Sequence, residues 1–402
     1  METTVIRDNI SRAAELIKAG ALVAVPTETV YGLAGNGLDE QAVREIYEVK
    51  GRPEVKPLSL MVPGPEAIKR YCADVPAAAI RLAEHFWPGP LTIVLKASDL
   101  VPDIVRAGGA TVGLRCPDHP LTLEALRLAQ LPFAAPSANP SGALSPKTAE
   151  DVLRYFSGKI EAVIDGGPCG IGFESTILDM SKTPYQILRQ GALSEAEIKK
   201  VLAEQMIKIG ITGGTGCGKT TALMELQKMG ALILDCDAVY HELLSSNARM
   251  LSEIDFHFPG TVIDGKLERK ALGAIVFADP AALETLNRIT HRYVGLEVQS
   301  RLEDWAMSGG RLAAIDAIEL LSSGLAEQCT ATIGIIADEE VRASRIMARD
   351  NISKEYALLR IRAQKPNQYF IDNCDFTVEN NGDVSLFVEK FQVLMKEILK
   401  NG

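Results

Sequence analysis

The hydrophobic and polar positions along the chain form two successive sets of short strands that alternate with helices. In the first half, apolar and β-branched runs typical of strands occupy residues 21–27 (ALVAVPT), 91–97 (LTIVLKA), 161–166 (EAVIDG) and 175–180 (STILDM). Proline and glycine cluster in the loops around them. This half is therefore predicted to be an α/β domain.

Helical spacing marks two further segments of the first half. In residues 38–50 the apolar positions recur on one face of a helix. Residues 193–205 begin with Ser194 and Glu197, the Ser-x-x-Glu pattern of a capping box, and continue with apolar residues at helical spacing. We expect this second segment to be the helix that closes the first domain.

The second half opens directly with a strand and continues as alternating strands and helices. Its strand-like runs are residues 207–212 (IKIGIT), 231–235 (ALILD), 313–316 (AAID) and 331–337 (ATIGIIA). Strands that alternate with helices favour a doubly wound parallel sheet. One continuous domain with an inserted loop is the alternative, but two independent sets of strands favour two domains, at residues 1–205 and 206–402.

Composition and charge narrow the class of protein. The chain has 402 residues, with 47% hydrophobic and 23% charged residues, as expected for two globular domains. Residues 1–205 contain 21 basic and 25 acidic residues, and residues 206–402 contain 21 and 27. Because neither half has a basic excess, strong nucleic-acid binding is not expected.

Cysteine spacing and hydropathy indicate a cytoplasmic protein. The seven cysteines are scattered and form no C-x-x-C pair, which favours a reduced cytosol over a disulfide scaffold or a zinc site. No apolar run reaches the roughly 18 residues that a membrane span needs, and the N-terminus lacks a signal-peptide pattern. We therefore expect no membrane partner.

A phosphate-binding loop follows the first strand of the second half. Residues 213–220 (GGTGCGKT) fit the pattern G-x-x-x-x-G-K-[ST]. Such glycines let backbone N–H groups curl around an anion at a helix N-terminus. Lys219 can reach the β- and γ-phosphates of ATP, and the Thr220 hydroxyl can ligate Mg²⁺. An ordinary glycine-rich turn is the alternative.

Two carboxylates and two arginines are further candidates in this half. Asp235 and Asp237 follow an apolar strand, at the sheet edge where the phosphate loop is expected. Either could accept the proton of an attacking hydroxyl, or both could be helix caps or outer-shell groups near magnesium. Arg345 and Arg349 are four residues apart, so a helix places them on one face, which could also be a solvated charged face.

Residues 206–402 resemble the dephospho-coenzyme A kinase family. The resemblance rests on GITGGTGCGKTT, LDCDAVYHELL, DGKLERKALGAIVFADPAALETLNRITH, RIMARDNISKEYALLRIRAQ and DFTVENNG. It implies a P-loop kinase with a helical lid that phosphorylates the ribose 3′-hydroxyl of dephospho-CoA. Asp237 matches the catalytic base. The resemblance also places Arg360 and Gln364 in the lid. The residues that match the family's ATP-binding positions are Gly213, Thr215, Gly216, Cys217, Gly218, Lys219, Thr220, Thr221, Arg345 and Arg349.

The second half departs from this family at two places. Arg292 follows His291 where proline is common, and DAIELLSSG replaces a D-V-P-L-L type stretch. Both departures concern the acceptor site and leave the phosphate chemistry unchanged. A kinase with another small nucleotide or nucleoside as acceptor is therefore the alternative.

The first half carries five separated motifs rich in small hydroxyl residues and isolated cations. They are PTETVYG, KGRPEVKPL, VGLRCPDHP, APSANPSG and GFESTILD. Alone, each reads as a turn or a surface charge. Together and in this order they resemble the YrdC-like threonylcarbamoyl-AMP synthase family over about residues 5–200. The resemblance implies a twisted α/β sheet with a cationic cavity, and the conversion of L-threonine, bicarbonate and ATP to threonylcarbamoyl-AMP and pyrophosphate.

The resemblance also assigns residues. Thr29, Arg115 and Ser175 match positions that hold threonine, with Arg115 pairing its carboxylate. Positions around the triphosphate and adenosine match Lys50, Arg52, Lys56, Ser137, Asn139, Ser145 and Arg189. Met61 replaces a histidine of some members, and Gln190 replaces a common proline.

The implied reaction needs no side-chain nucleophile. A carbamate made from bicarbonate and the threonine amine attacks the α-phosphate of ATP, and Mg²⁺ is expected to screen the leaving pyrophosphate. The product would pass to a tRNA-modification transferase that acts at adenosine 37. Two alternatives are an RNA-binding module without catalysis, which the acidic balance disfavours, and a chain in which one half is inactive.

Overall fold

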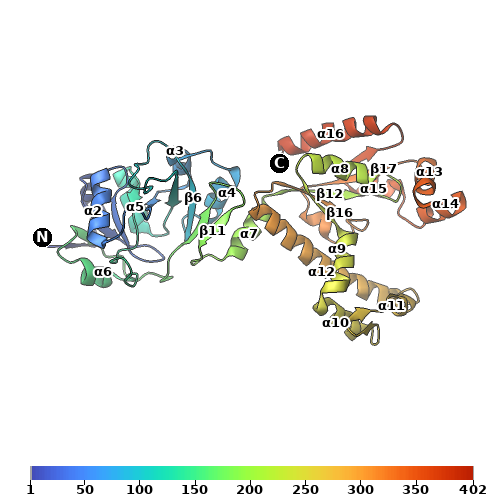
Figure 1. Cartoon of the computed structure of the whole chain (residues 1–402), viewed down its shortest axis with the longest axis horizontal. Coiled ribbons are helices and arrows are strands. Elements are labelled where there is room, and N and C mark those ends of the chain that lie inside the picture. The colour runs from blue at the N-terminus through green and yellow to red at the C-terminus, as the bar shows by residue number, and fades with distance from the viewer. Residues whose placement is uncertain (1, 402) are drawn as a thin grey trace. The chain divides into compact units, whose positions relative to one another are not determined.

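The computed structural model describes residues 2–401 and divides them into two compact units (Figure 1). The first unit contains the chain up to Gln205 together with Met307–Gly309. The second unit contains Met206–Ala306 and the chain from Gly310 onward. Each unit has its own sheet, so each is described by itself.

The first unit is built on one mixed sheet of eleven strands. The strands are β1 (Thr4–Ile6), β2 (Val23–Val25), β3 (Gly32–Asn36), β4 (Ser59–Met61), β5 (Cys72–Ala73), β6 (Leu91–Ala97), β7 (Thr111–Arg115), β8 (Phe133–Ala134), β9 (Ala162–Ile164), β10 (Thr176–Asp179) and β11 (Gln186–Arg189). Their order is β1-β9-β2-β3-β8-β4-β7-β6-β10-β11, with β5 paired to β6. All four strands predicted in this half are present.

Strand register in this sheet brings distant residues together. β4 and β7 are parallel, and Met61 lies opposite Arg115. β6 and β10 are also parallel, and Thr92 lies opposite Ile177. The ends of these strands therefore bring Met61, Arg115 and Ser175, the residue before β10, to one region of the sheet.

Helices flank the sheet of the first unit. They are α1 (Ile10–Lys18), α2 (Glu40–Lys50), α3 (Ile68–Tyr71), α4 (Ala77–Phe86), α5 (Pro120–Ala129), α6 (Ala149–Phe156) and α7 (Glu195–Glu204). The predicted capping box of α7 is confirmed, because Ser194 accepts from the Glu197 N–H and Glu197 accepts from the Ser194 N–H. α2 ends at Gly51 in the left-handed conformation, a common helix terminator.

The second unit contains a five-stranded parallel sheet with order β13-β16-β12-β17-β18. Its strands are β12 (Ile207–Thr212), β13 (Leu232–Asp235), β16 (Leu312–Asp316), β17 (Ala331–Ile336) and β18 (Phe376–Glu379), with a separate hairpin of β14 (Val262–Ile263) and β15 (Lys266–Leu267). β12 and β17 are almost entirely buried, which explains their continuous apolar runs. The predicted parallel sheet is confirmed.

Helices cover this sheet and extend beyond it. They are α8 (Lys219–Lys228), α9 (Cys236–Ser246), α10 (Ala248–His257), α11 (Arg269–Val276), α12 (Pro280–Met307), α13 (Glu339–Asp350), α14 (Lys354–Arg362), α15 (Asn367–Asn373) and α16 (Val384–Asn401). α8 and α16 pack side by side over the sheet (Figure 1). α13 and α14 form a helical pair with its own small core, as expected for the predicted lid.

The fold class predicted from the sequence is confirmed in both halves. The first unit is a mixed α/β structure and the second is a parallel α/β structure with additional helices. Among the described residues, no helix combines the length and the apolar character that crossing a membrane would require.

Candidate active sites

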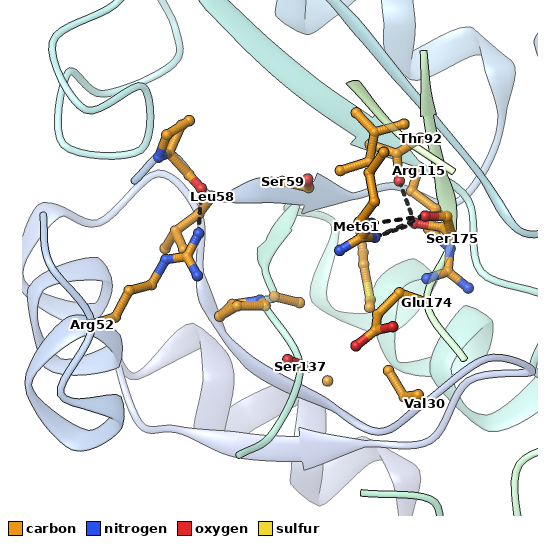
Figure 2. A pocket seen from close by; sticks show the side chains of 16 residues that line it. Val30, Arg52, Leu58, Ser59, Met61, Thr92, Arg115, Ser137, Glu174 and Ser175 are labelled. Atoms are coloured by element: carbon orange, nitrogen blue, oxygen red, sulfur yellow. Dashed lines mark hydrogen bonds between the residues drawn. The ribbon is translucent and has the colours of Figure 1, made fainter. Parts of the chain in front are cut away.

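A cationic cavity of about 160 Å³ lies in the first unit (Figure 2). Its walls include three arginines, four hydroxyl side chains and one carboxylate: Arg52, Arg115, Arg189, Ser59, Thr92, Ser137, Ser175 and Glu174. The arginines come from the loop after α2 and from the ends of β7 and β11. The cavity thus gathers anion-binding groups from three distant parts of the chain.

Arg115 is the most enclosed of these arginines. Its side chain is 8% exposed, and its guanidinium lies 2.8 Å from Glu28 Oε1. The same Nη2 atom donates to Thr29 Oγ1 at 2.7 Å. Two of the three predicted threonine-binding residues are therefore in direct contact, and a carboxylate that the sequence analysis did not identify fixes the arginine.

Arg189 and Ser175 form another part of the cavity wall. Arg189 donates to the Ser175 carbonyl through Nε and Nη2, at 3.1 and 2.8 Å. The Ser175 hydroxyl is buried and lies 2.8 Å from Thr92 Oγ1. Burial is the main cause that lowers the pKa of Arg189. This partly desolvated guanidinium gains more from an anion than one in water would.

Lys50 and Lys56 do not line the cavity, although the family resemblance assigned both to positions around the triphosphate and adenosine. Lys50 is 3% exposed and donates from Nζ to the carbonyls of Ser137 and Asn139. Burial lowers its pKa to about 7. Lys50 therefore supports the loop that carries Ser137, while Lys56 is exposed.

The loop at residues 135–145 supplies one hydroxyl to the cavity wall and a second just behind it. Ser137 lines the cavity directly. Asn139 is not among the lining residues and donates to the carbonyls of Pro140 and Ala143. Ser145 donates to Glu174 Oε1 at 2.6 Å, and this hydrogen bond is the first cause that lowers the pKa of Glu174. Glu174 therefore carries its charge at neutral pH.

The two departures from the family pattern lie in different surroundings. Met61 is buried in the cavity wall, and its Cε would be 3.0 Å from a Cβ added at Gly32. An apolar thioether therefore fills the position of a possible polar contact. Gln190 is exposed and donates to the Leu193 carbonyl at 2.6 Å, so it serves the local loop.

The second unit has a phosphate loop between β12 and α8. Gly213 has φ 142°, and a Cβ there would lie 2.3 Å from the Ile335 carbonyl oxygen, so only glycine fits. Gly218 has φ 94° and caps α8 without a side-chain acceptor. The first backbone N–H groups of α8 therefore have no side-chain acceptor and are available to bind an anion.

A cavity of about 330 Å³ faces this loop. Its lining contains the predicted residues Gly213, Thr215, Gly216, Gly218, Lys219, Thr220, Arg345 and Arg349. Cys217 is fully buried beneath the loop, and burial raises the pKa of its thiol. Thr221 lies in the first turn of α8 without lining the cavity.

Lys219 is held toward the end of the neighbouring strand. Its Nζ lies 2.9 Å from Asp316 Oδ1, and both side chains are largely buried. Burial raises the pKa of Asp316, and Lys219 opposes this shift. A bound phosphate would therefore compete with Asp316 for the ammonium group.

Arg342 and Gln364 hold the phosphate loop from behind. Arg342 is 3% exposed and donates from Nε to the Thr215 carbonyl at 3.0 Å. Gln364 Oε1 accepts from the Thr215 N–H at 2.8 Å and from Arg342. Gln364, which the resemblance assigned to nucleotide, therefore contacts the loop backbone, and Arg342 was missed although it lies on the same helix as Arg345.

The arginines of α13 and α14 divide into two groups. Arg345 contacts the phosphate loop through the Gly216 carbonyl and also donates to Asn380. Arg349 and Arg360 both donate to Asp350, and these hydrogen bonds lower the pKa of its carboxyl to about 2. Arg349 still lines the cavity, whereas Arg360 does not.

Asp235 and Asp237 have separate roles. Asp235 is the N-cap of α9 and accepts from the N–H groups of Asp237 and Ala238. Asp237 is exposed in the first turn of α9 and lines a second cavity, of about 220 Å³. Ile318 lines both this cavity and the phosphate cavity, so the two adjoin.

The second cavity contains several groups of the motif at residues 264–291 and of the departing stretch. Its lining residues include Tyr240, His291 and Glu319. Burial lowers the pKa of His291. Arg292 points elsewhere, since it is exposed and pairs with Glu253. Of the two departures, the stretch at Ile318 and Glu319 therefore contacts this cavity directly.

Several residues of both sites were missed, although most stand inside quoted motifs. Glu28 and Glu174 belong to PTETVYG and GFESTILD, and Asp316 ends the predicted strand AAID. The sequence-based prediction considered cationic and hydroxyl side chains and therefore did not include these three carboxylates. A search for carboxylates at strand ends would have found Asp316.

Two family models match the chain, one in each half. The model described as "Telomere recombination", named for Sua5, YciO and YrdC, matches residues 15–191. The model described as "Dephospho-CoA kinase" matches residues 206–385. The matches lie in the first and second units respectively.

Three curated relatives illustrate these similarities. A threonylcarbamoyl-AMP synthase from Pyrococcus abyssi is 47% identical over 201 residues, which cover 50% of this chain and 59% of the relative. A protein from Methanocaldococcus jannaschii, provisionally named for the same activity, is 37% identical over 174 residues, 43% of this chain and 81% of the relative. A dephospho-CoA kinase from Anaeromyxobacter dehalogenans is 35% identical over 192 residues, 47% of this chain and 91% of the relative.

Coverage differs between the two halves. This chain spans 59% of the length of the Pyrococcus abyssi and Bacillus subtilis synthases, whose matches account for half of this chain. It spans 91% of the Anaeromyxobacter dehalogenans kinase.

Proposed function

The chain belongs to the threonylcarbamoyl-AMP synthase family in its first half and to the dephospho-CoA kinase family in its second half, and we propose that it is a bifunctional enzyme with both activities. The first half converts L-threonine, bicarbonate and ATP to threonylcarbamoyl-AMP and pyrophosphate. The second half transfers the γ-phosphoryl group of ATP to the ribose 3′-hydroxyl of dephospho-CoA. Both are enzyme families that use a nucleotide.

In the first reaction the protein acts by positioning charges. Threonine enters with its carboxylate toward Arg115 and its polar groups toward Thr29 and Ser175. Its amine and bicarbonate form a carbamate with loss of water, and a carbamate oxygen then attacks the α-phosphorus of ATP while pyrophosphate leaves. Arg52 and Arg189 stabilise the negative charge that develops on the phosphates.

The convergence of three guanidinium groups in one enclosed cavity carries this proposal. Among the described residues, neither histidine nor cysteine lines the cavity, which suits a reaction without a covalent intermediate. The pocket dimensions and the acidic balance of the unit favour small anions over an RNA backbone.

In the second reaction the two adjoining cavities hold donor and acceptor. Lys219 and the N-terminus of α8 bind the phosphates of ATP, and Asp237 accepts the proton of the attacking 3′-hydroxyl. The shared wall at Ile318 carries this proposal, because phosphoryl transfer needs both substrates in adjacent pockets.

Mg²⁺ is proposed to accompany ATP at the kinase site. The Thr220 hydroxyl and the Asp316 carboxylate are hard oxygen donors that fit this ion. Among the described residues, no cluster of three acidic, histidine or cysteine side chains could hold a metal ion. When bound, the ion neutralises phosphate charge.

Two assays on the purified chain test the proposal. With ATP, threonine and bicarbonate, we expect threonine-dependent pyrophosphate and an AMP-linked product. With ATP and dephospho-CoA, we expect ADP and CoA. Pyrophosphate release without threonine, or ADP formation with other nucleosides in preference to dephospho-CoA, would contradict the respective half of the proposal.

A further inference from the structure

The cationic cavity contains one feature that the proposed reaction does not use, the carboxylate of Glu174. Among the described residues that line the cavity, Glu174 is the one acidic side chain, beside Arg52, Arg115 and Arg189. Figure 2 shows its carboxylate pointing into the open space between Val30 and Ser137. A negative charge in a cavity for anionic substrates needs a specific role.

The backbone holds Glu174 in this orientation. Its carbonyl accepts from the Ala192 N–H at 3.1 Å, and the next carbonyl, of Ser175, accepts from Arg189. A Cβ added at Gly191 would lie 2.3 Å from the Glu174 carbonyl oxygen, so the two segments are in close contact. The side chain therefore projects from a fixed segment toward the cavity.

Glu174 and Ser145 present two oxygen acceptors side by side. Ser145 donates its only hydroxyl hydrogen to Oε1, and the backbone N–H of Glu174 also hydrogen-bonds this carboxylate. The lone pairs of Ser145 and the remaining lone pairs of the carboxylate stay available as acceptors. This hydrogen bond and the charge of Arg189 keep the pKa of Glu174 below its ordinary value, so the group remains an acceptor at neutral pH. Two adjacent acceptors match two adjacent O–H donors.

The charge of Glu174 also limits which part of ATP can lie beside it. Phosphate oxygens are acceptors with negative charge, so a carboxylate repels them. The nucleobase carries its amino donor on a single nitrogen, whereas the ribose carries two vicinal hydroxyls. The ribose is therefore the part of the nucleotide that matches this pair of acceptors.

We propose that Glu174, with Ser145, accepts hydrogen bonds from the ribose hydroxyls of the nucleotide and thereby directs its phosphates away from itself and toward Arg52. This assignment rests on the proposed use of ATP by the first half. It makes Glu174 a specificity-determining residue that selects ribonucleotides over deoxyribonucleotides and fixes the direction in which the triphosphate enters.

A binding experiment tests this assignment without turnover. In the full chain carrying Lys219→Ala, which weakens nucleotide binding at the second unit, the dissociation constants of ATP, 2′-deoxy-ATP and 3′-deoxy-ATP are compared. We expect ATP to bind about 10-fold or more tightly than at least one deoxy analogue, because hydrogen bonds to a charged acceptor have this effect. Adding Glu174→Ala should reduce that ratio to about 2-fold or less, and Glu174→Gln should give an intermediate ratio.

The matched control is Glu124→Gln, an exposed carboxylate on α5 that should keep the wild-type ratio. An unchanged ratio in Glu174→Ala would overturn the assignment. So would a higher threonine KM with unchanged nucleotide binding, which would assign the carboxylate to the amino group of threonine.

Failure of the proposed reaction would look different. A chain with the expected ribose discrimination but no threonine-dependent pyrophosphate release would refute the synthase activity and support the role of Glu174. A chain that releases pyrophosphate with threonine but accepts ATP and both deoxy analogues equally would support the synthase activity and refute that role.

Discussion

The phosphate loop at residues 213–220 takes its anion-binding groups from consecutive backbone positions, whereas the cavity of the first unit takes its arginines from a loop and two strand ends. The loop depends on glycine conformations that little else can replace, as at Gly213. The cavity depends on side chains, each held by its own partner, as Arg115 is by Glu28. The phosphate loop can therefore be recognised in the sequence as a continuous motif. The cationic cavity appears in the sequence only as a set of residues that are far apart.

This difference also predicts how each site responds to mutation. Loss of Lys219 from the loop leaves the loop's backbone N–H groups in place, but removes the lysine that we propose contacts the γ-phosphate. Loss of one arginine from the cavity leaves two others, so it should weaken a particular substrate contact more than the whole reaction. The four predictions below test this contrast.

The largest expected effect is that of Lys219→Ala. Removing this ammonium should lower ADP formation with dephospho-CoA by about 1,000-fold or more, because it stabilises the transferring phosphoryl group. Threonine-dependent pyrophosphate release, measured on the same sample, should stay within about 2-fold of wild type. Lys390→Ala, an exposed lysine of α16, is the control, and loss of both activities would show that the two halves are not independent.

The next effect is that of Asp237→Asn. Steady-state kinetics should show a fall in kcat of about 100- to 1,000-fold with little change in the KM for ATP, because a general base acts in the chemical step. Asp235→Asn is the matched control, since asparagine caps a helix as well as aspartate does. Equal losses in kcat and ATP affinity would remove Asp237 as the base.

A smaller effect is expected at Arg115. Arg115→Lys keeps the charge but loses the planar fork, so the KM for threonine should rise by about 10- to 100-fold, with a smaller change in the KM for ATP. Lysine is chosen because alanine would leave Glu28 buried without its partner. Arg127→Lys on the surface of α5 is the control. An unchanged threonine KM would count against Arg115 as the carboxylate anchor.

The smallest effect concerns the pH dependence of stability through Lys50. Burial lowers its pKa from 10.5 to about 7, so between these values the unfolded chain binds a proton that the folded chain does not. The free energy of unfolding should therefore rise with pH, by up to about 1.4 kcal/mol per pH unit from this group. The additional free energy of unfolding from Lys50 is lost again as the pH falls toward 7.

Lys50→Met should remove that pH dependence. Between about pH 7.5 and about pH 9.5, the stability of wild type should increase by about 1–2 kcal/mol more than that of the variant, measured by thermal or denaturant unfolding of the first unit's transition. Lys159→Met, an exposed lysine, should behave as wild type. Parallel pH profiles for wild type and Lys50→Met would show that burial does not shift this lysine.

Much of the fold could be predicted from local patterns. The strands at 91–97 and 207–212 are β6 and β12, and the capping box at Ser194 begins α7 at the expected residue. The helix at 38–50 begins later, at Glu40, and buries Lys50, which a one-face pattern of apolar residues had left outside. The spacing of apolar residues predicts which face of a helix is buried. It does not predict that a charged residue such as Lys50 is buried because its ammonium group donates to backbone carbonyls.

The sequence by itself determined the α/β class, the parallel sheet of the second half and the phosphate loop, because each depends on residues close together in the chain. Only the tertiary structure decided that Lys50 supports a loop, that Glu28 fixes Arg115, that Glu174 faces the cationic cavity and that Ile318 joins two cavities. These contacts link residues that the sequence separates widely. Their geometry depends on strand register and loop packing, which no local spacing specifies.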